Sequence, residues 1–406
     1  MVGKDNETMK SKVQSLVRKA GRIMLTIILI LLSVILILTG VLFTWSYPGK
    51  PSPFLDENGD LLAGSISEKI FVNINGVEQG MIIKGKNVNN PILLYLHGGM
   101  PDYFLTQKYP TKLEDNFTVV WWEQRGSGIS FRDDIPKESI TLEQLISDTL
   151  VVTNYLRNRF HREKIYLMGH SGGTFFGIQV AAWHPELYYA YIGEAQSTYQ
   201  LKSEKLVYDY MLQEFRASGD TEMVQKLEDA PVTLENGTPA GYLAVRDVAM
   251  HRLGIGTTHD MKSIVTGLFL PSLTFREYTL MEKVNMWRGK ARNGVSVIWD
   301  ASLYTDLSLH VTESDIPIYF LEGVYDYTCN YSLAEDYFGK IIAPLKGFYT
   351  FEQSAHCPIF EEPEKALKIF IEDVLNGTNN LADKRENASR LDCMPVPPLA
   401  GNANGL

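Results

Sequence analysis

The sequence predicts an α/β fold in which a mostly parallel sheet is covered by helices on both faces. Short apolar runs, which suit strands buried on both faces, alternate along the chain with segments of helical periodicity. This alternation stops near residue 197, where mainly helical sequence begins, and it resumes with an apolar run after residue 308. The interruption predicts a helical cap at 197–308, inserted between the sixth and seventh strands.

The composition is that of a globular protein with an acidic balance. The chain has 406 residues, of which 45% are hydrophobic and 21% are charged, and its formal net charge is −10. These values allow one large domain that carries an insertion. No basic stripe is present to neutralise phosphates, so the sequence predicts no nucleic-acid binding. The oligomeric state does not follow from the composition.

The N-terminal region has the pattern of a membrane anchor. Residues 1–22 contain six Lys and Arg side chains, and the apolar run at 23–45 exceeds the roughly 20 residues that a helix needs to cross a bilayer. The alternative is a cleaved signal peptide, whose apolar region is usually about 7–15 residues and precedes a small-residue cleavage site. Trp45 and Tyr47 suit a membrane interface. The positive-inside rule makes 1–22 cytoplasmic and predicts a single-pass protein whose catalytic domain is extracytoplasmic.

Residues 46–66, rich in proline and glycine, are expected to form a spacer before one domain at 67–376. The domain opens with two strands, 69–76 and 78–85, joined by a turn at Asn75-Gly76. Further strands are expected within 90–99, 117–128, 164–174, 187–195, 316–323 and 347–353, and helices at 141–160, 175–185 and 363–376. The tail at 377–406, rich in Asn, Ala, Pro and Gly, is expected to be disordered.

Ser171 is the candidate nucleophile. It is the centre of GHSGG at 169–173, which fits the pattern G-x-S-x-G and stands between an apolar strand and a helix. Glycines on both sides permit a sharp turn that presents the hydroxyl at the carboxyl end of the sheet. His170 is expected to point away from this hydroxyl. The alternative interpretation is a Gly-Ser loop without chemistry.

A serine nucleophile needs a base and an acid to orient that base. His356 follows the last expected strand, and Asp326 follows the preceding one, so both stand in the chain order serine, acid, histidine. Glu322 is a second candidate acid, but it still belongs to the strand pattern. A structural loop histidine and a turn-forming aspartate are the alternatives.

Stabilisation of an oxyanion is expected from the backbone N–H groups of Gly99 and Gly172. His97 is expected to brace the loop that contains Gly99. No metal or organic cofactor is expected, since no Cys/His cluster has zinc-ligand spacing. Three cysteines, Cys329, Cys357 and Cys393, do not make a disulfide framework, and free thiols are the simpler interpretation.

Taken together, the motifs resemble those of a known family. In chain order they are LHGG at 96–99, EQRGSGIS at 123–130, GHSGGT at 169–174, GVYD at 323–326 and SAH at 354–356. This order is similar to that of α/β-hydrolases, and most similar to the proline iminopeptidase-related group, over about residues 66–376. The resemblance implies an α/β-hydrolase fold, a triad of Ser171, Asp326 and His356, and Gly99 as an oxyanion donor.

The sequence departs from this group at several positions. Residues 100–102 replace the Pro-Gly of HGGPG, Glu123 replaces an Asp, and Gly172 stands where true iminopeptidases tend to carry Trp. Those peptidases hold the substrate's α-amine with cap glutamates. The candidates in this chain are Glu194 and Glu204, with Glu214 as a third.

The function expected from these residues is hydrolysis of an ester or amide bond of a small substrate through an acyl-enzyme intermediate. The expected partners are a small molecule or short peptide and, through the N-terminal helix, a membrane. A proline iminopeptidase-like aminopeptidase is the first alternative. A hydrolase-fold protein that binds without catalysis is the second.

Overall fold

The computed structural model describes residues 2–387, and these contain a nine-stranded sheet in the order β1-β2-β4-β3-β5-β6-β7-β8-β9. The strands are β1 (Ile66–Ile74), β2 (Val77–Gly85), β3 (Ile92–Leu96), β4 (Thr118–Trp122), β5 (Ile165–His170), β6 (Tyr188–Glu194), β7 (Ile318–Gly323), β8 (Leu345–Phe351) and β9 (Lys384–Asn387). The pairs from β4 through β3, β5, β6 and β7 to β8 are parallel. The pairs β1–β2, β2–β4 and β8–β9 are antiparallel. The predicted fold class is therefore confirmed.

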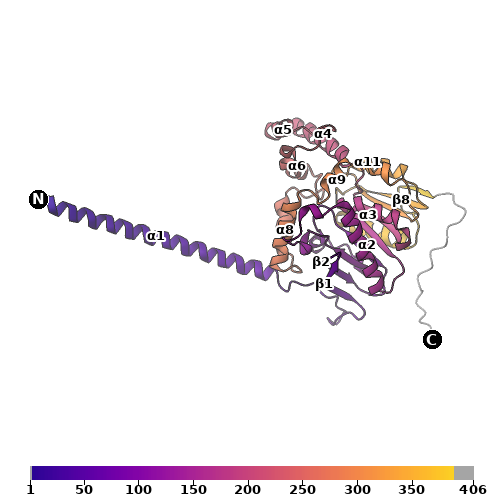
Figure 1. Ribbon diagram of the computed structural model, residues 1–406, viewed down its shortest axis with the longest axis horizontal. Coiled ribbons are helices and arrows are strands. Elements are labelled where there is room, and N and C mark those ends of the chain that lie inside the picture. Colours follow the sequence, from indigo (N-terminus) through magenta and orange to yellow (C-terminus); the bar gives the residue numbers. More distant parts are fainter. Residues whose placement is uncertain (1, 388–406) are drawn as a thin grey trace.

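Helices cover both faces of this sheet (Figure 1). The α-helices of the described residues are α1 (Val2–Trp45), α2 (Leu142–Arg159), α3 (Gly172–Trp183), α4 (Gln200–Ser218), α5 (Thr221–Glu228), α6 (Ala240–Leu253), α7 (Leu270–Thr274), α8 (Leu280–Asn293), α9 (Trp299–Tyr304), α10 (Leu307–His310), α11 (Tyr331–Lys340), α12 (Pro358–Glu361) and α13 (Pro363–Ile369). Thr141 caps α2 as expected, since its hydroxyl accepts a hydrogen bond from Gln144 N at 3.2 Å.

The central strands are mainly apolar because both faces of the sheet are buried there. In β3, Leu94 packs in the cluster that includes residues of α2 and α3, whereas Leu93 and Tyr95 pack in the cluster on the other face. This division follows from the alternation of side chains along a strand. Covering both faces leaves only the ends of the strands for a binding site.

The helical cap lies between β6 and β7 in the chain and contains α4 to α10. Figure 1 shows α4, α5 and α6 grouped at one end of the domain. These helices have an apolar cluster of their own, which includes Met211, Leu227 and Tyr242. The cap is thus a packed unit, and it does not depend on the sheet for all of its burial.

Helix α1 leaves the domain as one long rod (Figure 1). Its segment Leu16–Trp45 has 30 residues and, by length and composition, is the one helix among the described residues able to cross a membrane. At a rise of about 1.5 Å per residue it exceeds a bilayer core of about 30 Å. The end of α1 is tied to the cap, because Lys283 Nζ donates to Trp45 O at 2.9 Å.

The expected disorder at 377–406 is wrong for the part that the structure describes. Residues 384–387 form β9, which pairs antiparallel with β8. The Asp373 carboxylate accepts the backbone N–H groups of Asn380 and Leu381, at 2.8 Å each, and leads the chain to this edge. The segment is polar and lacks a strand pattern, so pairing with an available sheet edge decides its conformation. Residues 388–406 lie outside the described residues.

Candidate active site

Ser171 occupies a strained turn between β5 and α3. Its φ is +54° and its ψ is −123°, a conformation that side chains rarely adopt. The flanking glycines are required by close packing: a Cβ on Gly173 would lie 2.1 Å from Leu96 O, and a Cβ on Gly169 would lie 2.8 Å from the Gly173 backbone. The local sequence therefore forms the elbow that its pattern predicts, with the serine at the start of a helix.

A cavity between the carboxyl ends of the strands and the cap, here called the central cavity, contains this serine. Ser171 and His356 both line it, together with the loop at 98–102. The cap contributes apolar side chains, which include Met250, Ile264, Leu268 and Trp287, and the charged side chains Arg246, Asp247 and Lys290. The cavity thus joins the candidate nucleophile and base to a wall of cap residues.

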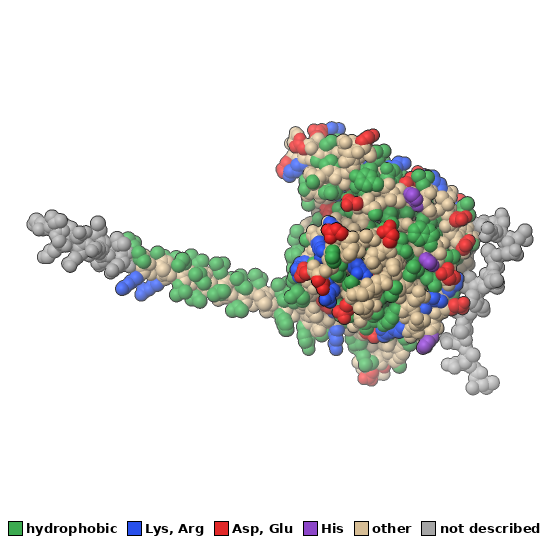
Figure 2. Space-filling view, in the orientation of Figure 1, with side chains coloured by type: hydrophobic (Ala, Val, Ile, Leu, Met, Phe, Trp, Pro, Cys, Tyr) green, Lys and Arg blue, Asp and Glu red, His purple; other side chains and the backbone are tan. Residues whose placement is uncertain are grey.

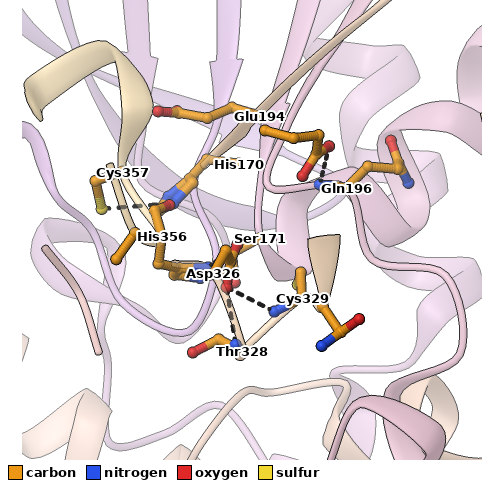
Figure 3. Close-up of polar contacts among 12 residues, drawn as sticks. His170, Ser171, Glu194, Gln196, Asp326, Thr328, Cys329, His356 and Cys357 are labelled. Carbon is orange, nitrogen blue, oxygen red and sulfur yellow. Dashed lines mark hydrogen bonds and ion pairs between the residues drawn. The ribbon is translucent and has the colours of Figure 1, made fainter. Parts of the chain in front are cut away.

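Asp326 and His356 form a hydrogen-bonded pair beside Ser171 (Figure 3). The His356 Nδ1 group donates to Asp326 Oδ2 at 2.8 Å, while Asp326 Oδ1 accepts the N–H groups of Thr328 at 2.8 Å and Cys329 at 3.0 Å. Within the described residues, His356 Nε2 has no hydrogen-bond partner. The pair therefore holds the imidazole in the tautomer whose Nε2 lone pair can accept a proton.

The loop that contains Gly98 packs closely against Ser171. A Cβ on Gly98 would lie 3.0 Å from Ser171 Oγ and 3.1 Å from Gly172 N, so this loop runs directly over the candidate nucleophile. In the part of the chain that the structure describes, the N–H groups of Gly99 and Gly172 donate to no acceptor. His97 braces the loop as a neutral ring, with Nδ1 donating to Gly98 O at 2.9 Å, and burial lowers the pKa of His97 to about 4.

His170 does not simply point away from the site. Its Nδ1 contacts Asp102 Oδ2 and its Nε2 contacts His356 O, both at 2.9 Å, so that each ring nitrogen faces an oxygen acceptor. Burial opposes the charged ring, but the carboxylates of Glu194 and Asp102, the latter hydrogen-bonded to Nδ1, favour it, and the pKa of His170 is raised well above its usual range. A buried imidazolium thus joins the loops that contain Asp102, Ser171 and His356. The GHSGG pattern contains no signal of this bridge.

A carboxylate on α12 fixes the loop that contains His356. Glu361 Oε1 accepts the N–H group of Ala355 at 2.8 Å and that of Cys357 at 3.4 Å, on either side of the histidine. Glu361 Oε2 accepts the N–H group of His259, from the cap, at 2.6 Å. The candidate base His356 is therefore fixed twice, by the hydrogen bonds of the residues on either side of it and by the bond from its own ring to Asp326.

The expectation that Glu194 contacts substrate is not supported, because Glu194 ends β6 beneath the elbow. It is 0% exposed, its Oε1 accepts Ile359 N at 2.9 Å, and its Oε2 is buried without a partner among the described residues. Burial raises the pKa of Glu194 to about 7. The strand pattern placed this residue at the sheet end, but only packing shows that the cavity does not reach it.

The effect of Glu194 on stability is expected to depend on pH. Its folded-state pKa of about 7 exceeds the ordinary value of 4.5, so its contribution is complete below 4.5 and is lost as the pH rises through about 7. Thermal melting between about pH 5 and pH 8 should therefore show a steeper decline for wild type than for Glu194→Gln. The exposed Glu186→Gln should retain the wild-type slope. Parallel melting curves for wild type and Glu194→Gln would contradict this assignment.

Glu204 also lies away from the cavity, although it belongs to the cap. Its carboxylate is 0% exposed and pairs with Arg246 through contacts of 2.6 Å and 2.7 Å, and it accepts the Tyr242 hydroxyl at 2.6 Å. Arg246 and Tyr242 both belong to the cap, so the hydrogen bonds of the Glu204 carboxylate are made inside the cap core. Glu214, the third candidate, is half-buried on α4 and does not line the cavity either.

Replacing Glu204 with glutamine is expected to destabilise the domain by about 3 kcal/mol, because it leaves the buried Arg246 charge without its main partner. Urea unfolding followed by far-ultraviolet circular dichroism measures this loss. The matched control is Glu214→Gln on the same helix, for which a change of no more than about 0.5 kcal/mol is expected. Equal stability of the two variants would show that the pair is not structural.

The two described cysteines are free thiols. Cys329 and Cys357 are both buried, and Cys357 Sγ lies 3.7 Å from His170 Nε2. Burial raises the pKa of the Cys357 thiol to about 12, so this group is a protonated thiol at neutral pH. Cys393 lies outside the described residues.

Comparisons with known proteins agree with this geometry. No protein-family model matches the sequence. The probable aminopeptidase YbaC of Bacillus subtilis is 30% identical over 296 residues, which are 72% of this chain and 91% of that protein. The solved structure of proline iminopeptidase from Mycobacterium smegmatis is 15% identical, has a TM-score of 0.53, and covers 75% of this chain and 96% of its own.

A serine hydrolase structure from Cycloclasticus zankles is 13% identical, has a TM-score of 0.50, and covers 76% of this chain and 99% of its own. At these identities the two structures show the fold alone. The relative from Bacillus subtilis shares enough sequence over most of its length to show common family membership. The chain therefore belongs to the same family as this probable aminopeptidase, and the solved structures show that it has the α/β-hydrolase fold.

Proposed function

We propose that this chain is a serine hydrolase that cleaves an ester or amide bond of a small substrate through an acyl-enzyme intermediate. The observation that carries the proposal is the Asp326–His356 pair, at 2.8 Å, whose histidine lines the same cavity as the strained Ser171. A polar pair of this kind beside an elbow serine is the arrangement that activates a hydroxyl. Family membership supports the same chemistry.

In the proposed first step, Ser171 Oγ attacks the substrate carbonyl carbon while its proton passes to His356 Nε2. The leaving alcohol or amine then takes that proton as its bond to the carbonyl breaks, which gives the acyl-enzyme. Asp326 keeps Nδ1–H of the base oriented and stabilises the imidazolium. In the second step, His356 takes a proton from water as the water oxygen attacks the acyl carbon. The bond from that carbon to Ser171 Oγ then breaks, Oγ takes the proton back from His356, and a carboxylic acid is released.

The charge that develops on the carbonyl oxygen requires donors that are already in place. We assign this role to the N–H groups of Gly99 and Gly172, as the sequence predicts. Support comes from the absence of another acceptor for either group within the described residues. The N-terminus of α3, which begins at Gly172, adds a favourable dipole.

A fluorophosphonate probe tests the proposal, because it reacts with activated serines. The full chain in detergent should be labelled, and peptide mapping should locate the adduct on Ser171. Prior denaturation should abolish labelling, which serves as the control for reaction with an activated site. An unlabelled native protein, or an adduct on another serine, would favour the non-catalytic binding protein instead.

An aminopeptidase activity is the second candidate, favoured by the name of the Bacillus subtilis relative. The glutamates expected to hold an α-amine do not line the cavity, but Asp102 and Asp247 do. Asp102 Oδ1 is buried and has no hydrogen-bond partner among the described residues. Naphthylamides of proline, alanine and leucine, compared with short nitrophenyl esters, discriminate the two activities. Cleavage of esters without any cleavage of free-amine substrates would reject the peptidase.

We further propose that Leu16–Trp45 anchors the chain in a membrane as a single span, with the catalytic domain on the extracytoplasmic side. The support is the length and apolar composition of the segment and the basic residues before it. Protease added to intact cells should digest the domain and spare an N-terminal tag. A domain released without the helix would instead identify a signal sequence.

A further inference from the structure

The cap contains one apolar helical segment, Ile264–Thr274, here called the apolar cap segment. It consists of a π-helical turn, η6 (Val265–Phe269), followed directly by α7. Pro271 lies in the first turn of α7 and supplies no backbone N–H, which removes a hydrogen bond and favours the wide π turn before it. The segment is thus a short helix whose irregular part adjoins the central cavity.

The inner face of this segment lines the cavity and the outer face is exposed. Ile264 and Leu268 point inward as lining residues. Val265, Phe269 and Leu270 are 57%, 39% and 44% exposed, which is unusual for three large apolar side chains within six residues of a globular domain. A single helix therefore separates the cavity from an apolar outer surface.

Phe269 links the outer face to the cavity wall. Its ring packs edge-on against Trp287 of α8, with ring centroids 5.2 Å apart. Trp287 lines the cavity, and its Nε1 donates to Ser272 Oγ at 2.9 Å. Trp287 is therefore the one side chain between Phe269 on the outer face and the central cavity.

Exposed apolar side chains also lie on α8, and Lys283 of this helix contacts the end of α1. Met281 and Val284 are 62% and 43% exposed. Between them, Lys283 Nζ donates to Leu273 O at 2.6 Å and to Trp45 O at 2.9 Å, so one lysine ties α7, α8 and α1 together. Figure 2 shows hydrophobic side chains along α1 and on the flank of the domain beside their junction. We call Val265, Phe269, Leu270, Met281 and Val284 the apolar flank.

The charges near the apolar flank do not oppose contact with lipid. Glu282 is 2.7 Å from Lys69 Nζ, and Glu277 is 3.6 Å from Lys84 Nζ, so both carboxylates are paired. Arg276 is exposed at this edge, and its Nε donates to Tyr47 O at 3.1 Å. Cations at the rim of an apolar surface are favoured beside lipid headgroups.

We infer that the apolar flank rests on the bilayer that anchors α1, and that the central cavity draws its substrate from that bilayer. The substrate class is then an amphiphile whose acyl chain is held in ester or amide linkage. This inference rests on the proposed hydrolase and on the proposed anchor. We infer a bilayer as the partner of this surface because α1 ends beside it. Among the described residues, α1 is the one helix long and apolar enough to span a membrane.

The cavity suits such a substrate. Phe104 and Leu105, from the loop after β3, line it together with the cap residues Met250 and Leu268, so an acyl chain would meet apolar side chains from both the sheet and the cap. Hydrolysis breaks the bond between the acyl carbon and the headgroup oxygen or nitrogen. Water supplies the oxygen of the released fatty acid and the proton of the released headgroup. The fatty acid can return to the bilayer across the same flank.

The first test measures contact with lipid in the full chain, reconstituted into phosphatidylcholine vesicles. A bimane label on Leu270→Cys, in a Cys393→Ser background, should be quenched by brominated acyl chains. The same label on Leu309→Cys should not be quenched, because Leu309 is equally apolar and 75% exposed but lies on α10. Equal quenching at the two positions, or none at 270, would overturn the docking surface.

The second test separates docking from catalysis. The variant Val265→Glu/Leu270→Glu in vesicles should lose at least about tenfold in kcat/KM on a long-chain nitrophenyl ester dissolved in the bilayer, because charge opposes burial of this flank. Its activity on water-soluble nitrophenyl acetate should stay within about twofold, and Leu309→Glu should leave both activities intact.

The outcomes of this second test are distinguishable. Equal loss on both esters, or loss on neither, would overturn the inference that substrate arrives from the bilayer. If the wild-type protein cleaves neither ester, the proposed hydrolase function fails. In that case the quenching experiment still decides whether the flank contacts lipid.

Discussion

Replacing Ser171 with alanine is expected to lower kcat by a factor of about 10⁴ or more, because no other group can form the acyl-enzyme. Alanine removes only the hydroxyl and suits the backbone at 171 about as well as serine does. KM should change little, since the cavity that binds the substrate is otherwise intact. Steady-state hydrolysis of a nitrophenyl ester, with circular dichroism to verify folding, measures the effect.

Ser296→Ala is the matched control for this prediction. The Ser296 hydroxyl also lies beside the elbow, 3.4 Å from where a Cβ on Gly172 would stand, and it accepts Ile298 N at 3.3 Å. Its loss is expected to change kcat by less than about threefold, as for a hydroxyl outside the reaction. If Ser171→Ala keeps substantial activity while Ser296→Ala loses it, the nucleophile has been assigned to the wrong serine.

Replacing Asp326 with asparagine is expected to lower kcat by a factor of about 10³ to 10⁴. Asp326 Oδ1 accepts two backbone N–H groups, from Thr328 and Cys329, so the asparagine oxygen must take that position. The amide NH₂ then faces His356 Nδ1 and forces this nitrogen to accept. The proton moves to Nε2, which can no longer act as a base.

The control for Asp326→Asn is Glu322→Gln, which alters the other acid that the sequence offered. Glu322 is fully buried in β7, where its Oε1 accepts Gln196 N at 2.9 Å, and burial raises its pKa well above the usual range. Glutamine resembles the protonated acid, so kcat should stay within about threefold. If Glu322→Gln loses activity and Asp326→Asn does not, Glu322 is the acid of the site and Asp326 is not.

Local sequence was sufficient for the elements around the site. The hairpin turn at Asn75-Gly76 follows from two residues that accept positive φ, and these angles are 47° and 79° in the structure. The elbow at Ser171 likewise follows from its glycines, which allow packing that a Cβ would block. In both cases the determining contacts lie within a few residues or within one strand–helix unit.

Burial and partnership of charged residues could not be predicted in this way. Glu204 is neutralised by Arg246, which is 42 positions away, and Asp102 meets His170 across 68 positions. No periodicity or motif relates the members of such pairs. The positions of both acids therefore follow only from the packed structure. Glu204 lies within the cap core, and Asp102 is hydrogen-bonded to His170.

The sequence by itself determined the fold class, the elbow at Ser171 and the order in which the acid and the base follow, because strand burial and turn geometry are local properties of the chain. Only the tertiary structure decided which carboxylates line the cavity, that residues 384–387 add a strand, and that the run at 264–274 turns one face outward beside α1. These features depend on free energies of burial and pairing between distant segments, and those exist only once the segments meet.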